Sequence, residues 1–316
     1  MSPGHVVTLA GGVGAARMLA GLVQVVDPAQ LTAIVNTGDD LVLHGLDISP
    51  DLDTVTYTLA GAIDPERGWG LAGETWHAME SLGRYGGEAW FNLGDRDLGT
   101  HLYRTARRRD GATLSQVTAE IAAAWGLGLR LLPVTDDELR TRVTIIDAEP
   151  AGLEIGFQEY FVQRRHSVPV SAVRFAGAEA TRPAPGVLEA IGGAERLVIA
   201  PSNPIVSIGP LLAVPGVRQA VEARRADVVA VSPIIAGAAL KGPADRLLTE
   251  LGHESSVVGV ARLYAELAGT LVIDTADAAL ASTVEAEGLR CVVTDTIMSD
   301  PERSAALARV VLGGAA

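Results

Sequence analysis

The sequence contains one cysteine, Cys291, among its 316 residues. A single thiol excludes an internal disulfide and a cysteine cluster that binds a metal. No apolar run approaches the roughly 20 residues that a membrane-spanning helix needs. The first residues carry neither a basic region nor an apolar core long enough for a signal peptide. We therefore expect a soluble, cytoplasmic protein with no membrane partner.

Basic residues are scarce relative to acidic ones. The 25 lysines and arginines face 38 aspartates and glutamates, which gives a formal net charge of −13. Because a nucleic-acid surface needs a basic excess, this composition argues against a nucleic-acid partner. Anionic ligands can then bind only where backbone amides, local arginines or a divalent metal supply positive charge.

Apolar stretches of strand length alternate with helical patterns along the chain, which has 48% hydrophobic residues. Strands are predicted at 6–10, 31–35, 197–200, 227–231, 271–273 and 291–293. This alternation predicts an α/β fold with a doubly wound, mostly parallel Rossmann-like sheet. We expect one domain over residues 1–316, with a helical insertion at about 54–128 and a ribbon or flap at about 154–176.

The first strand ends in a glycine turn, Gly11, Gly12 and Gly14, before a helix predicted at 15–25. A strand, glycine turn and helix together direct backbone N–H groups at an anion. The guanidinium of Arg17 can donate further, charge-assisted hydrogen bonds to the same anion. The alternative is that the glycines only allow the turn itself to pack closely. A dinucleotide is disfavoured, because Arg17 replaces the third glycine of that fingerprint and no acidic residue ends the second strand.

Carboxylates gather after the second strand, and we expect them on loops that face one pocket. They are Asp39, Asp40, Asp51 and Asp53. Such oxygens hold Mg²⁺ in phosphate chemistry. The alternative for Asp53 is N-capping of a helix predicted at 54–62. The turn at Asp95, Arg96 and Asp97 has a comparable alternative, and His101 is expected to be a packed or surface residue.

Several strand-exit turns carry polar groups, including Ser202 and Asn203 after the strand at 197–200. Because ligands of open parallel sheets bind outside the carboxyl ends of the strands, these turns are expected to meet at one site. Each turn alone is weak support, since loops are generally polar.

The residues that carry these features also match a known family. The motifs are LAGGVGAAR (9–17), NTGDD (36–40), HGLDISPDLDT (44–54), RGWGLAGETW (67–76), LGDRDLGTHL (93–102), LLPVTDD (131–137), APSNPIVSIGPLLAVPG (200–216) and VSPIIAGAALKGPADRL (231–247). In this order they resemble the 2-phospho-lactate transferase family of coenzyme F-420 biosynthesis. The resemblance covers about three quarters of the chain.

The resemblance implies a reaction. Such enzymes move a phospholactyl or phosphoenolpyruvyl group from a guanosine diphosphate donor to the terminal ribityl hydroxyl of the deazaflavin Fo. GMP leaves, Mg²⁺ assists, and the enzyme is expected to be a homodimer. The sequence does not distinguish a lactyl from an enolpyruvyl donor.

The resemblance also suggests roles for individual residues. Donor phosphate and nucleotide are assigned to Gly11, Gly12, Gly14, Arg17, Ser202 and Asn203. Catalysis and Mg²⁺ are assigned to Asp39, Asp40 and Asp53. Fo is assigned to Asp51, Trp69, Asp95, Arg96 and Asp97, of which Asp95 and Asp97 could also serve the metal.

Two other functions stay open at this point. One is a sugar-nucleotide-binding regulatory protein of similar fold that does not transfer a group. The other is a generic nucleotidyl- or glycosyltransferase on the same sheet. A binding module has no need of the carboxylates between Asp39 and Asp53 or of the LGDRD turn, so these favour the transferase.

Overall fold

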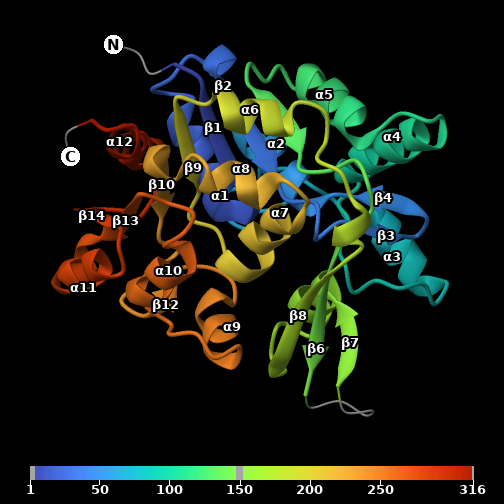
Figure 1. Cartoon of the computed structure of the whole chain (residues 1–316). Coiled ribbons are helices and arrows are strands. Elements are labelled where there is room, and N and C mark those ends of the chain that lie inside the picture. The colour runs from blue at the N-terminus through green and yellow to red at the C-terminus, as the bar shows by residue number, and fades with distance from the viewer. Residues whose placement is uncertain (1–3, 147–151, 315–316) are drawn as a thin grey trace.

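The computed structural model describes residues 4–146 and 152–314. Its centre is a seven-stranded sheet in the order β14-β13-β10-β9-β1-β2-β5, with every neighbouring pair parallel (Figure 1). The strands are β1 (Val6–Ala10), β2 (Leu31–Val35), β5 (Arg130–Pro133), β9 (Arg196–Ile199), β10 (Val228–Val231), β13 (Thr270–Asp274) and β14 (Arg290–Thr294). The predicted doubly wound, Rossmann-like α/β fold is confirmed.

Both faces of this sheet are covered by helices, which explains why its strands are apolar without alternation. In β1, Val6 and Ala10 belong to one hydrophobic core, and Val7 and Leu9 belong to the other. The first core includes α1 (Gly12–Leu22), α2 (Pro50–Leu59), α5 (Leu114–Ala124) and α12 (Pro301–Val311). The second includes α6 (Val187–Gly193), α7 (Gly209–Ala213), α8 (Val217–Glu222), α10 (Val257–Tyr264) and α11 (Ala281–Ala286).

The connection from β2 to β5 contains a β-hairpin and four helices. It contains the hairpin β3 (Leu41–Leu43) and β4 (Leu46–Ile48), then α2, α3 (His77–Arg84), α4 (Asp97–Arg109) and α5. Figure 1 shows α3, α4 and the hairpin side by side at one end of the molecule.

Two predicted helix starts are wrong. The helix predicted at 15–25 begins at Gly12, and the helix predicted at 54–62 begins at Pro50. Ser49 is therefore the N-cap residue of α2, and Asp53 does not cap this helix. A proline at the first position and acidic residues in the first turn both suit a helix start. Asp51 and Asp53 consequently lie on a helix and not on a loop.

A second, antiparallel sheet projects from the main body (Figure 1). It consists of β6 (Arg140–Ile145), β7 (Leu153–Gly156) and β8 (Val170–Ala176), with β6 in the centre. A π-helix, Glu159–Gln163, lies between β7 and β8. These elements have a core of their own that also includes Val206 and Leu247.

The other elements are short. A hairpin of β11 (Ile234–Ile235) and β12 (Ala238–Ala239) precedes α9 (Ala244–Glu250), and a second π-helix spans Pro204–Ile208. Short 3₁₀ helices lie at Pro28–Gln30, Ala178–Ala180, Arg225–Asp227 and Thr275–Leu280. None of the helices within residues 4–146 and 152–314 is long and apolar enough to span a membrane.

Candidate active site

A cavity of about 590 Å³ lies at the carboxyl ends of the central strands. Its walls come from the loops that follow β1, β9 and β10, from α2 and α4, and from the π-helix of the small sheet. β1 is the strand at which the chain order reverses, because β2 pairs on one side and β9 on the other. This is the position where doubly wound folds bind ligands.

The glycine turn after β1 forms one end of the cavity. The backbone N–H of Gly12 donates to Asp51 Oδ1 at 2.9 Å, and Asn36 Nδ2 donates to Asp51 Oδ2 at 2.9 Å. On the other side, Ser202 Oγ donates to the carbonyl of Gly11 at 2.8 Å. The turn is therefore held between α2 and the loop after β9.

Two of these glycines are required for different reasons. Gly12 has a φ of +72°, a conformation that other residues rarely adopt. A Cβ on Gly14 would lie 2.2 Å from the carbonyl oxygen of Pro201, which is backbone and cannot move aside cheaply. Gly14 thus allows α1 to pack against the loop after β9.

Arg17 and Asn203 line the same end of the cavity. Arg17 donates to the carbonyl of Met298 at 3.4 Å. Asn203 Oδ1 caps the π-helix Pro204–Ile208 by accepting from the N–H groups of Ile205 and Val206. Its Nδ2 atom is buried and has no hydrogen-bond partner within the described residues. This amide is left to donate to a ligand.

Asp39 and Asp51 are buried carboxylates in the cavity wall, each about 6% exposed. Burial raises the pKa of Asp39 well above its usual range, and the nearby charge of Asp51 raises it further. Burial also raises the pKa of Asp51 to about 6, although hydrogen bonds from Asn36 and Gly12 oppose this. In the described parts of the chain, no basic side chain lies within 4.0 Å of either carboxylate. The two carboxyl groups therefore lie in the cavity wall without a compensating cation.

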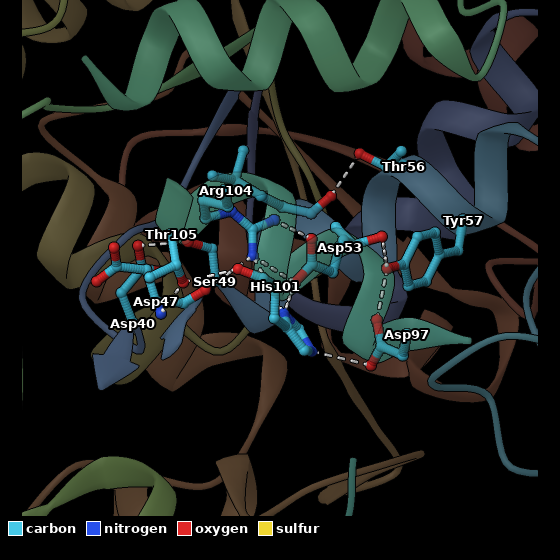
Figure 2. Close-up of polar contacts among 12 residues, drawn as sticks. Asp40, Asp47, Ser49, Asp53, Thr56, Tyr57, Asp97, His101, Arg104 and Thr105 are labelled. Atoms are coloured by element: carbon cyan, nitrogen blue, oxygen red, sulfur yellow. Dashed lines mark hydrogen bonds and ion pairs between the residues drawn. The ribbon is translucent and has the colours of Figure 1, made fainter. Parts of the chain in front are cut away.

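A second polar cluster, drawn in Figure 2, joins α2 to α4. The buried guanidinium of Arg104 pairs with both carboxylate oxygens of Asp53. Arg104 Nη1 also lies 3.3 Å from His101 Nδ1, and His101 Nε2 lies 3.2 Å from Asp97 Oδ2. The hydroxyl of Tyr57 donates to the other oxygen of Asp97.

This geometry determines the tautomer of His101 and the charge of Asp97. Arginine only donates, so His101 Nδ1 accepts, and the ring proton lies on Nε2 toward Asp97. Burial opposes ionisation of Asp97, but hydrogen bonds from His101 and Tyr57 outweigh it and lower the pKa of Asp97. Asp97 is thus an ionised carboxylate in the cavity wall, able to accept a hydrogen bond from a hydroxyl.

Aromatic side chains form another part of the cavity wall. All thirteen aromatic residues of the chain lie in the described segments, and six of them line this one cavity. They are Tyr57, Trp69, Trp90, Phe91, Phe157 and Phe161. The rings of Phe157 and Phe161 stack with centroids 5.6 Å apart and an angle of 9°. Such walls suit a flat ring system.

Three of the predicted site residues do not line the cavity. Asp40 follows Asp39 directly but faces a separate cavity of about 120 Å³, where it accepts from the hydroxyl of Ser49. Asp95 accepts from the backbone N–H groups of His77 and Ala78 and so caps α3. Arg96 donates to the carbonyl of Ala72. The structure gives these three residues contacts within the protein in place of the predicted ones.

The other predicted residues do lie together. The cavity is lined by Gly11, Gly12, Gly14, Arg17, Asp39, Asp51, Asp53, Trp69, Asp97, Ser202 and Asn203.

Sequence reasoning missed some residues of the site. His101 is buried against Asp97, and the i, i+4 spacing of the two residues on α4 was a readable signal. Lys241 also lines the cavity, and it is the single lysine among the 25 basic residues. For Phe157 and Phe161 the sequence offers no comparable signal, because they reach the cavity only through the packing of the small sheet.

Comparison with known proteins agrees with the geometry. Residues 6–311 match the family described as 2-phospho-L-lactate transferase CofD. The chain is 48% identical over 310 residues to the phosphoenolpyruvate transferase of Streptomyces griseus, covering 98% of this chain and 97% of that protein. It is 43% identical over 318 residues to the enzyme of the same name from Mycolicibacterium smegmatis, with 97% of each chain covered.

Among solved structures, a UPF0052 family protein from Bacillus halodurans is similar in fold. It superposes with a TM-score of 0.63 at 17% identity, covering 99% of both chains. This likeness concerns the fold alone.

Proposed function

The chain belongs to the 2-phospho-L-lactate transferase CofD family of coenzyme F-420 biosynthesis and is a phosphoenolpyruvate or 2-phospholactate transferase, and we propose that its donor is a guanosine diphosphate derivative and its acceptor the deazaflavin Fo. The donated group is phosphoenolpyruvyl, because the relatives at 43–48% identity are named phosphoenolpyruvate transferases.

One observation carries this proposal. A single cavity combines a glycine turn at a helix N-terminus, a set of buried carboxylates and an aromatic wall. The helix N-terminus suits the diphosphate, since the first backbone N–H groups of a helix have no partners inside it. The aromatic wall suits the flat ring of a deazaflavin. The carboxylates line the same cavity as the helix N-terminus and the aromatic wall. The phosphorus of the donor and the hydroxyl of the acceptor must meet in this cavity.

In the proposed reaction, the ribityl hydroxyl of Fo attacks the phosphorus that bears the enolpyruvyl group. A new P–O bond forms, the bond from this phosphorus to the bridging oxygen breaks, and GMP leaves with that oxygen. The hydroxyl proton is released in the process. Positioning and charge neutralisation supply most of the acceleration in such transfers.

We assign the orientation of the attacking hydroxyl to Asp97. His101 and Tyr57 hold this carboxylate from two sides, and both are buried. The ion pair between Asp53 and Arg104 in turn positions His101. A carboxylate fixed in this way loses little freedom when it accepts the hydrogen bond of the substrate.

Mg²⁺ fits Asp39 and Asp51 better than it fits Asp53. Asp39 Oδ1 is buried and has no hydrogen-bond partner within the described residues, and oxygen is the ligand type that Mg²⁺ selects. Asp53 lies near Asp97 and His101 in a group that could hold a metal, but Arg104 already neutralises it. When bound, the ion would neutralise charge on the donor phosphates. We therefore propose Asp39 and Asp51 as its protein ligands.

Mass spectrometry of a reaction mixture tests the function directly. The purified protein is incubated with Fo, Mg²⁺ and either the enolpyruvyl or the lactyl guanosine diphosphate donor. We expect equimolar GMP and phosphorylated Fo, faster with the enolpyruvyl donor, and loss of both products in EDTA. Formation of neither product with either donor would overturn the proposal, and full turnover in EDTA would overturn the metal.

A homodimer is proposed as the assembly. The sequence offers two amphipathic helices as possible contact faces, predicted at 54–62 and 74–85. In the structure they correspond to α2, which packs on α1, and to α3, of which Met79 is buried. Apolar side chains are instead exposed on the hairpin and on α4, with Val42 60%, Leu102 57% and Tyr103 44% exposed. Light scattering should give twice the 32.8 kDa of one chain, and Leu102→Asp should halve that mass. A single-chain mass for the wild type would contradict the dimer.

A further inference from the structure

Lys241 occupies a position in the cavity that the assignments above leave unexplained. It is the single lysine of a chain that otherwise uses arginine. It lies between β12 and α9 and lines the cavity, with its side chain exposed to solvent.

The lysine spans from one wall of the cavity to another. A Cβ built on Gly68 would lie 2.8 Å from Lys241 Nζ, so the ammonium rests against the backbone of the loop that carries Trp69. Next to it in sequence, a Cβ on Gly242 would lie 4.0 Å from the ring of Phe161. Lys241 therefore lies beside the loop of Trp69 and close to Phe161, a part of the wall that we call the aromatic end of the cavity.

The charge of this lysine is also uncompensated. No carboxylate lies within 4.0 Å of its Nζ atom in the parts of the chain that the structure describes. Of the other two cations in the cavity wall, Arg67 pairs with Asp64 at 2.9 Å and Arg17 lies at the glycine turn. The aromatic end thus has one free positive charge, which points to an anionic group of a ligand.

We propose that Lys241 binds the carboxylate of the three-carbon acid on the donor. This inference rests on the proposed function. In that donor the acid is attached to the phosphorus under attack, at the end opposite the guanosine. With the diphosphate at the glycine turn, the carboxylate extends toward the acceptor, which is the end where Lys241 lies. Lys241 is thus a binding residue that positions the reacting phosphorus.

A lysine suits this task better than an arginine. The ammonium is a compact charge with three donors on a flexible stem, whereas a guanidinium prefers a planar, two-pronged contact. The carboxylate of a donor moves as the phosphorus is displaced, and an ammonium can follow it. We therefore expect arginine at this position to restore binding only in part.

Because the chain has one lysine, an amine-specific reagent tests the contact without any turnover. The protein is treated briefly with trinitrobenzenesulfonate, and modification of the peptide that contains Lys241 is measured by mass spectrometry. The α-amino group reacts in a different peptide and serves as the internal reference. We expect the enolpyruvyl donor to slow labelling of Lys241 at least fivefold, and GDP or Fo alone to slow it less than twofold.

Each other outcome rejects the assignment in a distinct way. Equal protection by GDP would place the lysine on the diphosphate. Protection by Fo alone would place it on the acceptor. Absence of protection by a donor that binds would remove Lys241 from the donor site.

Variants provide a second measurement. Lys241→Met should raise the KM for the donor at least tenfold and leave the Kd for GDP within twofold, with Lys241→Arg between it and wild type. Arg218→Met, which removes one exposed charge on α8 outside the cavity, is the matched control and should match wild type. An unchanged donor KM in Lys241→Met would overturn the inference.

The two proposals fail differently. If the wild type neither binds GDP nor forms product, the proposed function is wrong. If it does both while Lys241 stays unprotected, only the assignment of the lysine is wrong.

Discussion

The carboxylate of Asp51 accepts a hydrogen bond from the backbone N–H of Gly12, with 2.9 Å between the two atoms. The glycine turn was predicted to present this N–H to phosphate, but a side chain of the protein already occupies it. A bound phosphate must therefore use the next N–H groups of α1, and it meets the negative charge of Asp51 nearby. Mg²⁺ at Asp51 would remove this repulsion.

We expect Asp51→Asn to bind GDP more tightly than wild type when the metal is removed. An asparagine can still accept from Gly12, although its own Nδ2 then faces the Nδ2 of Asn36, and it carries no charge to repel the diphosphate. A tenfold gain is expected, about 1.4 kcal/mol. Calorimetric titration with GDP in EDTA measures it. Weaker binding would show instead that the carboxylate is needed to shape the turn.

Gly14→Ala should destabilise the protein. The new methyl would meet the Pro201 carbonyl oxygen at 2.2 Å, and overpacking of this kind costs about 1–3 kcal/mol. Urea denaturation measures the loss. Gly192→Ala in α6 is the matched control, because nothing lies within 4 Å of its Cβ position and alanine favours a helix. Equal stability of the two variants would contradict the packing role of Gly14.

The strands were predictable because buried parallel strands are apolar on both faces. The strands at 6–10 and 31–35 have the predicted bounds. The carboxylate cluster was less predictable, because burial and pairing depend on distant residues. Arg104, which neutralises Asp53, lies 51 residues away on another helix. Adjacent positions also diverge, since Asp39 and Asp40 line different cavities.

Arg104→Met should destabilise the protein strongly, since it leaves the carboxylate of Asp53 buried without its partner. Removal of one member of a buried ion pair costs about 3–5 kcal/mol. The double variant with Asp53→Asn should lose at least 1 kcal/mol less than the sum of the single losses. Arg107 lies on the same helix as Arg104, and Arg107→Met breaks an exposed pair with Glu120 of α5, so it should cost far less stability. Chemical denaturation compares all four, and additive losses would contradict the coupling.

We expect the free energy of unfolding to fall in acid, because the contribution of ionised Asp274 is lost when this carboxylate is protonated. It accepts hydrogen bonds from the N–H groups of Ala276 and Thr296 and from the hydroxyl of Thr296. Burial raises its pKa, but these bonds outweigh it, and the pKa lies below the ordinary 3.8. A lowered pKa stabilises the fold above about pH 4, and that contribution is lost as the pH falls through the folded value. Asp274→Asn should therefore cost more stability at pH 7 than at pH 3.5, whereas an equal cost at both would exclude this titration.

Trp69 and Phe161 should contribute to binding of Fo and not of GDP. Both line the aromatic end of the cavity, and Trp69 is 42% exposed, so a ring can reach it. Aromatic contacts contribute about 0.5–1.5 kcal/mol each beyond area burial, so Trp69→Leu or Phe161→Leu should raise the KM for Fo about 2- to 12-fold. The Kd for GDP should stay within twofold.

Tyr85→Leu is the control for these two variants. Tyr85 is 86% exposed and does not line the cavity, so its loss should change neither constant. Steady-state kinetics with varied Fo, together with GDP titration of each variant, separates the two ends of the cavity. If Trp69→Leu and Phe161→Leu weakened GDP as much as Fo, these rings would support the cavity as a whole, and the acceptor would have to bind elsewhere.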